Sequence, residues 1–89
     1  MTYQVELHKR VQKFLNTQHD NFVEDFFEKA NLIAQNPNNI SILDIKALQW
    51  EEKWSYRLRI GKYRFKYTII HDKILIYFYD AGSRWDVYK

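Results

Sequence analysis

Hydrophobic and polar residues alternate near both ends of the chain and follow a helical period between them. In the stretch TYQVELH, residues 2–8, every second residue is apolar, which predicts a strand. Over residues 9–18 the period changes, and Val11, Phe14 and Leu15 mark one face of a short helix.

A second, longer helix is predicted to begin at Asn21. Asparagine is a good N-cap, and Glu24 stands at the capping-box position three residues later. The apolar stripe of this helix consists of Phe22, Phe26, Ala30 and Ile33. Asn36 and Pro37 end it, because the residue before proline avoids the helical region. So few residues separate the two helices that we expect an antiparallel hairpin.

The segment YRLRIGKYRFKY, residues 56–67, alternates almost without a break around one glycine. A two-residue type II′ turn at Gly61 and Lys62 would pair the strands on its two sides. The predicted pairs are Ile60–Tyr63, Leu58–Phe65 and Tyr56–Tyr67 on one face, and Arg59–Arg64 and Arg57–Lys66 on the other. The first face would form the core beneath the helices.

A second turn near residues 71–73 would return the chain for another strand. Its predicted core face carries Ile74, Ile76 and Phe78, and its outer face carries Leu75, Tyr77 and Tyr79. Residues 45–48 are a candidate short strand. The order of one strand, two helices and three or more strands predicts an α+β fold over residues 1–89, a single domain. We expect an antiparallel sheet of three to four strands, with the helices on one face.

Composition narrows the class of protein further. A hydrophobic content of 46% with 18% aromatic residues predicts a packed globule rather than a disordered chain. The absence of cysteine excludes disulfides and thiolate metal sites, and it fits a reducing cytoplasm. No apolar run approaches the roughly 20 residues of a membrane helix, and the N-terminus has no apolar signal core. We therefore expect a cytoplasmic protein with no membrane contact.

The predicted outer face gathers four cations around one turn. They are Arg57, Arg59, Arg64 and Lys66, with Tyr77 and Tyr79 beside them. Like charges directly opposite each other oppose sheet formation, and such a conflict is typical of a functional site. Arginine binds phosphate bidentately and aromatic rings stack on unpaired bases, so single-stranded RNA is the predicted ligand. The alternative is a solvated face that serves only solubility and edge protection.

These residues resemble a known family. The element order, the segment YRLRIGKYRFKY and the ending AGSRWDVYK are similar to the RelE/ParE superfamily of type II toxin–antitoxin toxins. RelE-like members cleave mRNA in the ribosomal A site without a metal or cofactor. ParE-like members share the fold, lack the basic catalytic set and poison DNA gyrase. The resemblance favours the RelE-like branch, with a cognate antitoxin, mRNA and the ribosome as partners.

The resemblance also implies roles for individual residues. It implies that Arg59, Arg64, Arg84 and Tyr88 are catalytic and that Arg57 binds the RNA. Lys66, Tyr77 and Tyr79 are expected RNA-binding residues because the alternation places them on the same outer face. Two features depart from the family pattern. Arg57 and Arg59 stand where some active members have lysine, and Ser83 stands where many relatives have histidine.

The chemistry implied is attack by the ribose 2′-oxygen on the adjacent phosphorus, with the 5′-oxygen leaving. Arg64 and Arg84 are the candidates for stabilising the pentavalent phosphate. The proton-transfer group stays open between Tyr88, if cations lower its pKa from about 10, and the carboxylates Glu51, Glu52 and Asp86. The three histidines have no metal-ligand spacing, so no metal is expected. A gyrase inhibitor without chemistry, or an inactive member that binds only antitoxin, remains an alternative.

Overall fold

A computed structural model of the chain describes residues 2–38, 44–48 and 54–83. In chain order the elements are β1 (Gln4–Leu7), α1 (Lys9–Asn16), α2 (Asp20–Gln35), β2 (Ile45–Ala47), β3 (Ser55–Ile60), β4 (Tyr63–Ile70), the 3₁₀ helix η1 (His71–Lys73) and β5 (Leu75–Gly82). The predicted α+β class and the two consecutive helices are confirmed, whereas the antiparallel packing of one helix on the other stays a prediction. Within these ranges, neither helix has the length and apolar content to cross a membrane.

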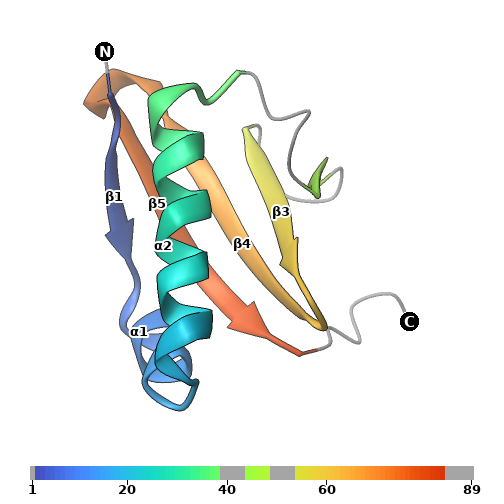
Figure 1. The fold of residues 1–89 in the computed structure, drawn as a ribbon. Coiled ribbons are helices and arrows are strands. Elements are labelled where there is room, and N and C mark those ends of the chain that lie inside the picture. Colours follow the sequence, from blue (N-terminus) through green and yellow to red (C-terminus); the bar gives the residue numbers. More distant parts are fainter. Residues whose placement is uncertain (1, 39–43, 49–53, 84–89) are drawn as a thin grey trace.

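The sheet has more strands than predicted, and one of them runs parallel to its neighbour. The order is β1-β5-β4-β3-β2, and Figure 1 shows β1 at one edge with α2 lying across the sheet. The pairs between β2, β3, β4 and β5 are antiparallel, whereas β1 pairs with β5 in parallel. Val5 lies opposite Ile76 and Leu7 opposite Phe78, so the apolar side of β1 extends the core face of β5.

The predicted hairpin of β3 and β4 is confirmed in every pair. Leu58 faces Phe65, Arg59 faces Arg64, and the other three predicted pairs also occur. Gly61 has a φ of +61°, and Lys62 keeps a negative φ. A positive φ at the first turn position alone is what a type II′ turn requires. The cations therefore lie on the face opposite Leu58 and Phe65.

The chain turns near residues 71–73, as predicted, but the connection from β4 to β5 is not a tight turn. Residues 71–73 form η1, and Ile74 follows in the left-handed region with a φ of 52°. β5 therefore begins at Leu75, and the prediction that Ile74 lies on the core face of the strand is wrong. Ile76 and Phe78 are fully buried on that face, as predicted. Leu75 is buried as well, but it alternates with Ile76 and is not part of the core cluster, which agrees with the predicted outer face.

A bulge shifts the second half of β5 by one residue. Tyr67 pairs with Phe78, but the next residue towards the turn, Lys66, pairs with Asp80. Tyr79 is the extra residue, so simple alternation did not predict the outer face correctly beyond Phe78. An acidic side chain, Asp80, takes the position opposite Lys66.

Helix α2 has its N-cap two residues earlier than predicted. Its N-cap is His19, which makes no side-chain capping hydrogen bond, and Asn21 lies inside the first turn. The predicted end is confirmed, because Asn36 is the C-cap. The shift leaves the apolar stripe of the helix unchanged, since Phe26, Ala30 and Ile33 are all buried.

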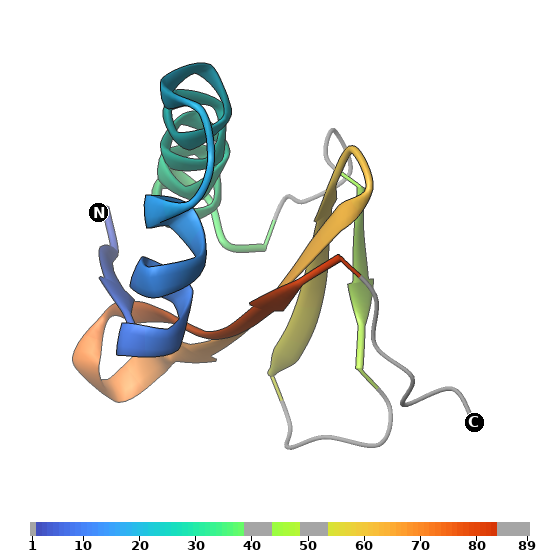
Figure 2. The ribbon, with the colours of Figure 1, turned by 90° about the horizontal axis from the view of Figure 1, so that it is seen from below.

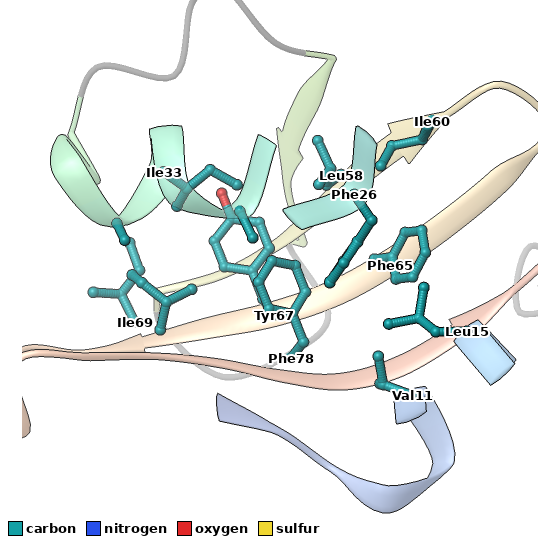
Figure 3. Close-up of a cluster of buried hydrophobic side chains, with 13 residues drawn as sticks. Val11, Leu15, Phe26, Ile33, Leu58, Ile60, Phe65, Tyr67, Ile69 and Phe78 are labelled. Atoms are coloured by element: carbon teal, nitrogen blue, oxygen red, sulfur yellow. The ribbon is translucent and has the colours of Figure 1, made fainter. Parts of the chain in front are cut away.

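Both helices cover the same face of the sheet, and Figure 2 shows them together on one side of β5. The core residues that Figure 3 labels come from α1, α2, β3, β4 and β5: Val11, Leu15, Phe26, Ile33, Leu58, Ile60, Phe65, Tyr67, Ile69 and Phe78. The Phe26 ring lies 4.5 Å from that of Phe65 and 5.0 Å from that of Phe78, between centroids. Packing of large aromatic rings compensates for the small size of the domain.

Candidate nucleic-acid interface

The outer face of the sheet carries its charges in two rows that cross the strands. One row consists of Asp44, Arg59, Arg64 and Gly82, and the other of Lys46, Arg57, Lys66 and Asp80. Each row has adjacent cations in the middle and one carboxylate at an edge, and the two carboxylates lie at opposite edges. The predicted clustering of Arg57, Arg59, Arg64 and Lys66 on one face is therefore confirmed.

Lys46 extends the cationic surface onto β2, and the sequence analysis did not identify it. It is exposed and lies directly opposite Arg57, on the side away from Lys66. The only sequence signal was the candidate strand at residues 45–48. Because the partner and register of that strand were unknown, its lysine could not be assigned to a face.

The cations differ in accessibility. The Arg59 side chain is 51% exposed, whereas that of Arg57 is only 9% exposed. Lys66 is also buried, and Arg64 is half-buried. Burying a charge is costly unless it is paired, so a role in solubility alone does not account for Arg57 and Lys66. Their proposed contact with RNA stays a prediction.

Asp44 connects the two arginines of β3. Its Oδ2 lies 2.6 Å from Arg59 Nε, and its Oδ1 lies 3.5 Å from Arg57 Nη2. The main chain holds the same residue in place, because Arg59 N–H donates to the Asp44 carbonyl at 2.9 Å. The carboxylate is thus part of the basic face, and sequence analysis gave no indication of it.

The row that contains Arg59 and Arg64 ends at Gly82, which has no side chain. A glycine within a strand often marks a place where a ligand or another backbone approaches closely. Arg59 is exposed, and Arg64 lies directly between it and the glycine in the ladder. This row therefore offers an approach for an anionic group.

The aromatic part of the interface lies on β5. Tyr77 is half-buried opposite Thr68, and Tyr79 is half-buried at the bulge. Beside them, Asp80 Oδ1 accepts a hydrogen bond from Ala81 N–H at 2.9 Å and lies 4.0 Å from Arg10 Nη1. Stacking of bases on Tyr77 and Tyr79 stays a prediction.

Several predicted residues lie outside the described part of the chain. These are Arg84 and Tyr88, together with the candidate carboxylates Glu51, Glu52 and Asp86. Within the described ranges, no group of three histidine, cysteine, aspartate or glutamate residues could hold a metal ion.

His71 belongs to a packing cluster at the end of β4 that is far from Arg64. Its Nδ1 lies 3.0 Å from the Tyr3 hydroxyl, and its ring meets the Trp54 ring edge-on at 4.7 Å between centroids. Tyr3 precedes β1 and Trp54 precedes β3, so this histidine connects two distant parts of the sheet. We see no role for it in the basic face.

Comparison with known proteins identifies relatives along the whole chain. The protein RelE1 of Methanocaldococcus jannaschii is 34% identical over 89 residues, which cover 100% of this chain and 98% of that protein. The RelE–RelB complex of Pyrococcus horikoshii OT3 contains a chain with a TM-score of 0.79 and 26% identity, and the match covers 92% of this chain and 94% of that one. No protein-family model matches the sequence.

The isolated E. coli RelE toxin has the same fold, with a TM-score of 0.75 and 19% identity over 97% of this chain and 90% of that one. At that identity the match shows the fold alone. The match to RelE1 extends over the full length of this chain and includes the basic hairpin. The chain belongs to the RelE family of type II toxin–antitoxin toxins, in the RelE/ParE superfamily.

Proposed function

We propose that the chain is the toxin of a RelBE-type pair and an endoribonuclease that cleaves mRNA in the ribosomal A site. The observation that carries this proposal is the cationic face of β2, β3 and β4. It sets an exposed Arg59 against Arg64, on the side of the sheet away from the helices. Family membership supports the toxin role, and the proposed action on the ribosome would take place in the cytoplasm, where ribosomes are found.

The proposed reaction uses protein charges in place of a metal. The ribose 2′-oxygen attacks the adjacent phosphorus, the bond to the 5′-oxygen breaks, and a cyclic phosphate forms. Arg59 and Arg64 would stabilise the charge that develops on the phosphate oxygens, because preorganised donors cost no reorganisation during the reaction. Arg84 would add a further charge. A proton must leave the 2′-oxygen and another must reach the 5′-oxygen, and Tyr88 is the proposed group for one of these transfers.

The proposed protein partner is a RelB-like antitoxin. The similar chains from P. horikoshii and E. coli were both solved in complexes of RelE with RelB. A cationic surface on this chain suits an antitoxin segment with acidic side chains. Binding of that segment should weaken as salt rises, because exposed charges are screened over about 8 Å at physiological ionic strength.

The test is expression of the chain without antitoxin, followed by primer extension on a translated reporter mRNA. We expect growth arrest and discrete cuts with cyclic phosphate ends. Arg64→Ala should lower cleavage by about 10²–10³, the typical effect of losing one preorganised donor. Lys73→Ala is the matched control, since it removes one exposed positive charge at the opposite end of β4.

Circular dichroism must show that both variants are folded. Undiminished cleavage by folded Arg64→Ala would contradict the proposed mechanism. Growth arrest with intact mRNA and inhibited gyrase would instead assign the chain a ParE-like function.

A further inference from the structure

The carboxylate of Asp44 lies within the surface that is proposed to bind RNA, where a negative charge is unexpected. It contacts Arg59 Nε at 2.6 Å and Arg57 Nη2 at 3.5 Å through different oxygens. A carboxylate in such a place has two possible effects. It could compete with a phosphate for the arginines, or it could hold them in the geometry that the phosphate needs.

The atoms that Asp44 contacts favour the second effect for Arg59. A guanidinium has five N–H donors in a rigid fork, and its Nη1–Nη2 edge can bind a phosphate bidentately. Asp44 engages Nε of Arg59, which leaves that edge for another acceptor.

Asp44 is well placed to hold a side chain still, because its own backbone is fixed. Its carbonyl accepts the Arg59 N–H at 2.9 Å, and β2 continues the ladder through the pair Ile45–Leu58. The two oxygens of one carboxylate then set the relative positions of Arg57 and Arg59. A binding group supported in this way loses less side-chain freedom when a ligand arrives.

We infer that Asp44 is a positioning residue of the RNA site: it orients Arg59, with Arg57 as its second contact, so that the guanidinium edge of Arg59 meets an RNA phosphate. This inference rests on the proposed function. It also reverses the expectation from charge alone, under which removal of an acidic residue from a basic face strengthens RNA binding.

Two variants of the full-length chain separate positioning from charge. Asp44→Asn and Asp44→Ala remove the same charge, but asparagine keeps an oxygen that can accept from Nε and alanine does not. If Asp44 positions Arg59, wild type should bind RNA most tightly, Asp44→Asn less tightly and Asp44→Ala most weakly. Charge alone predicts that both variants bind equally and more tightly than wild type. Glu24→Gln, on the exposed face of α2, is the control for net charge.

The binding probe is a fluorescein-labelled single-stranded RNA with methylated 2′-oxygens, so that it cannot be cut. Its Kd is measured by anisotropy for each variant. We expect Asp44→Ala to bind about three- to tenfold more weakly than wild type, the effect of freeing one flexible side chain. Glu24→Gln should bind as wild type does.

A second readout follows Arg59 directly. Hydrogen exchange at its Nε–H, observed by NMR, should be slow in wild type, intermediate in Asp44→Asn and fast in Asp44→Ala. This measurement needs no RNA. It also detects a variant in which β2 has moved, because the contact between residue 44 and Arg59 Nε would then be lost. Thermal unfolding shows which variants remain folded.

The outcomes are distinguishable. Wild-type protein that neither binds the RNA nor cleaves the translated reporter mRNA would overturn the proposed function and this inference with it. Wild-type binding with equal or tighter binding by Asp44→Ala would overturn the positioning role alone, as would an Nε–H exchange rate that does not respond to either variant.

Discussion

Replacement of Tyr67 by phenylalanine removes one oxygen atom from the centre of the core. Tyr67 is fully buried, and among the described residues its hydroxyl has no hydrogen-bond partner. Its ring packs against Phe78 at 5.0 Å and Tyr56 at 5.5 Å between centroids, and Figure 3 shows the hydroxyl directed towards α2. A buried unpaired hydroxyl costs about 1–3 kcal/mol, whereas phenylalanine keeps the ring contacts. We expect Tyr67→Phe to raise the free energy of unfolding at neutral pH by about 1 kcal/mol.

The same burial gives this prediction a pH dependence. Burial raises the pKa of the Tyr67 hydroxyl, and the neighbouring Tyr56 raises it further. In the unfolded chain the group ionises near pH 10, roughly the value for free tyrosine, whereas the folded chain keeps the proton. Above that pH the unfolded state binds fewer protons, so stability falls by up to about 1.4 kcal/mol per pH unit. Phenylalanine has no such proton, so the advantage of the variant should grow above about pH 10.

The assay is urea unfolding at neutral pH and in steps through the alkaline range, with thermal unfolding in parallel. For a domain of this size, 1 kcal/mol corresponds to a rise in Tm of about 4–8 °C. Tyr77→Phe removes the same atom from a half-buried ring and should change neutral-pH stability by less than about 0.5 kcal/mol. A lower neutral-pH stability of Tyr67→Phe would refute the reasoning, because it would mean that the hydroxyl is hydrogen-bonded in solution.

Two further predictions concern the connections of the sheet. Gly61→Ala should lower the free energy of unfolding by about 1–2 kcal/mol, because its φ of +61° disfavours a side chain although no atom lies within 4 Å of the added Cβ. Gly61→Asn should recover part of that loss in thermal unfolding. If the wild-type protein and Gly61→Ala were equally stable, a positive φ at residue 61 would be excluded. Tyr3→Phe removes the hydroxyl that lies 3.0 Å from His71 Nδ1 and should cost about 1 kcal/mol in urea unfolding. Unchanged stability would show that this hydrogen bond contributes nothing.

The hairpin of β3 and β4 could be predicted because two local signals agree. Gly61 sets the turn, and the alternation around it sets the faces. A slip of one residue would move Leu58 and Phe65 to the outer face, so the register is strongly specified. All five predicted pairs occur. The basic face followed from the same argument, since the side opposite the core residues had to carry the cations.

The features that could not be predicted depend on contacts between distant segments. Nothing near Tyr79 in the sequence marks the bulge that places Asp80 opposite Lys66. The parallel pairing of β1 with β5 joins segments at opposite ends of the chain. Asp44 likewise approaches Arg59 only because β2 pairs with β3, and a three-residue strand has too little pattern to set its own register.

In both rows of the outer face, neighbouring cations repel each other and one carboxylate offsets part of the charge. In one row Lys46, Arg57 and Lys66 lie side by side, and Asp80 closes it at β5. Like charges in such positions repel each other, so this row weakens the fold unless acids or an anionic ligand offset it.

The other row has the same repulsion between Arg59 and Arg64, with Asp44 at one edge and Gly82 at the other. Its single carboxylate is already shared with Arg57 of the neighbouring row. This carboxylate carries one negative charge against the two arginines that it contacts, so an excess of positive charge stays on β3. A phosphate beside Arg59 would relieve the repulsion, and the same positive charge would stabilise the transition state of the proposed cleavage.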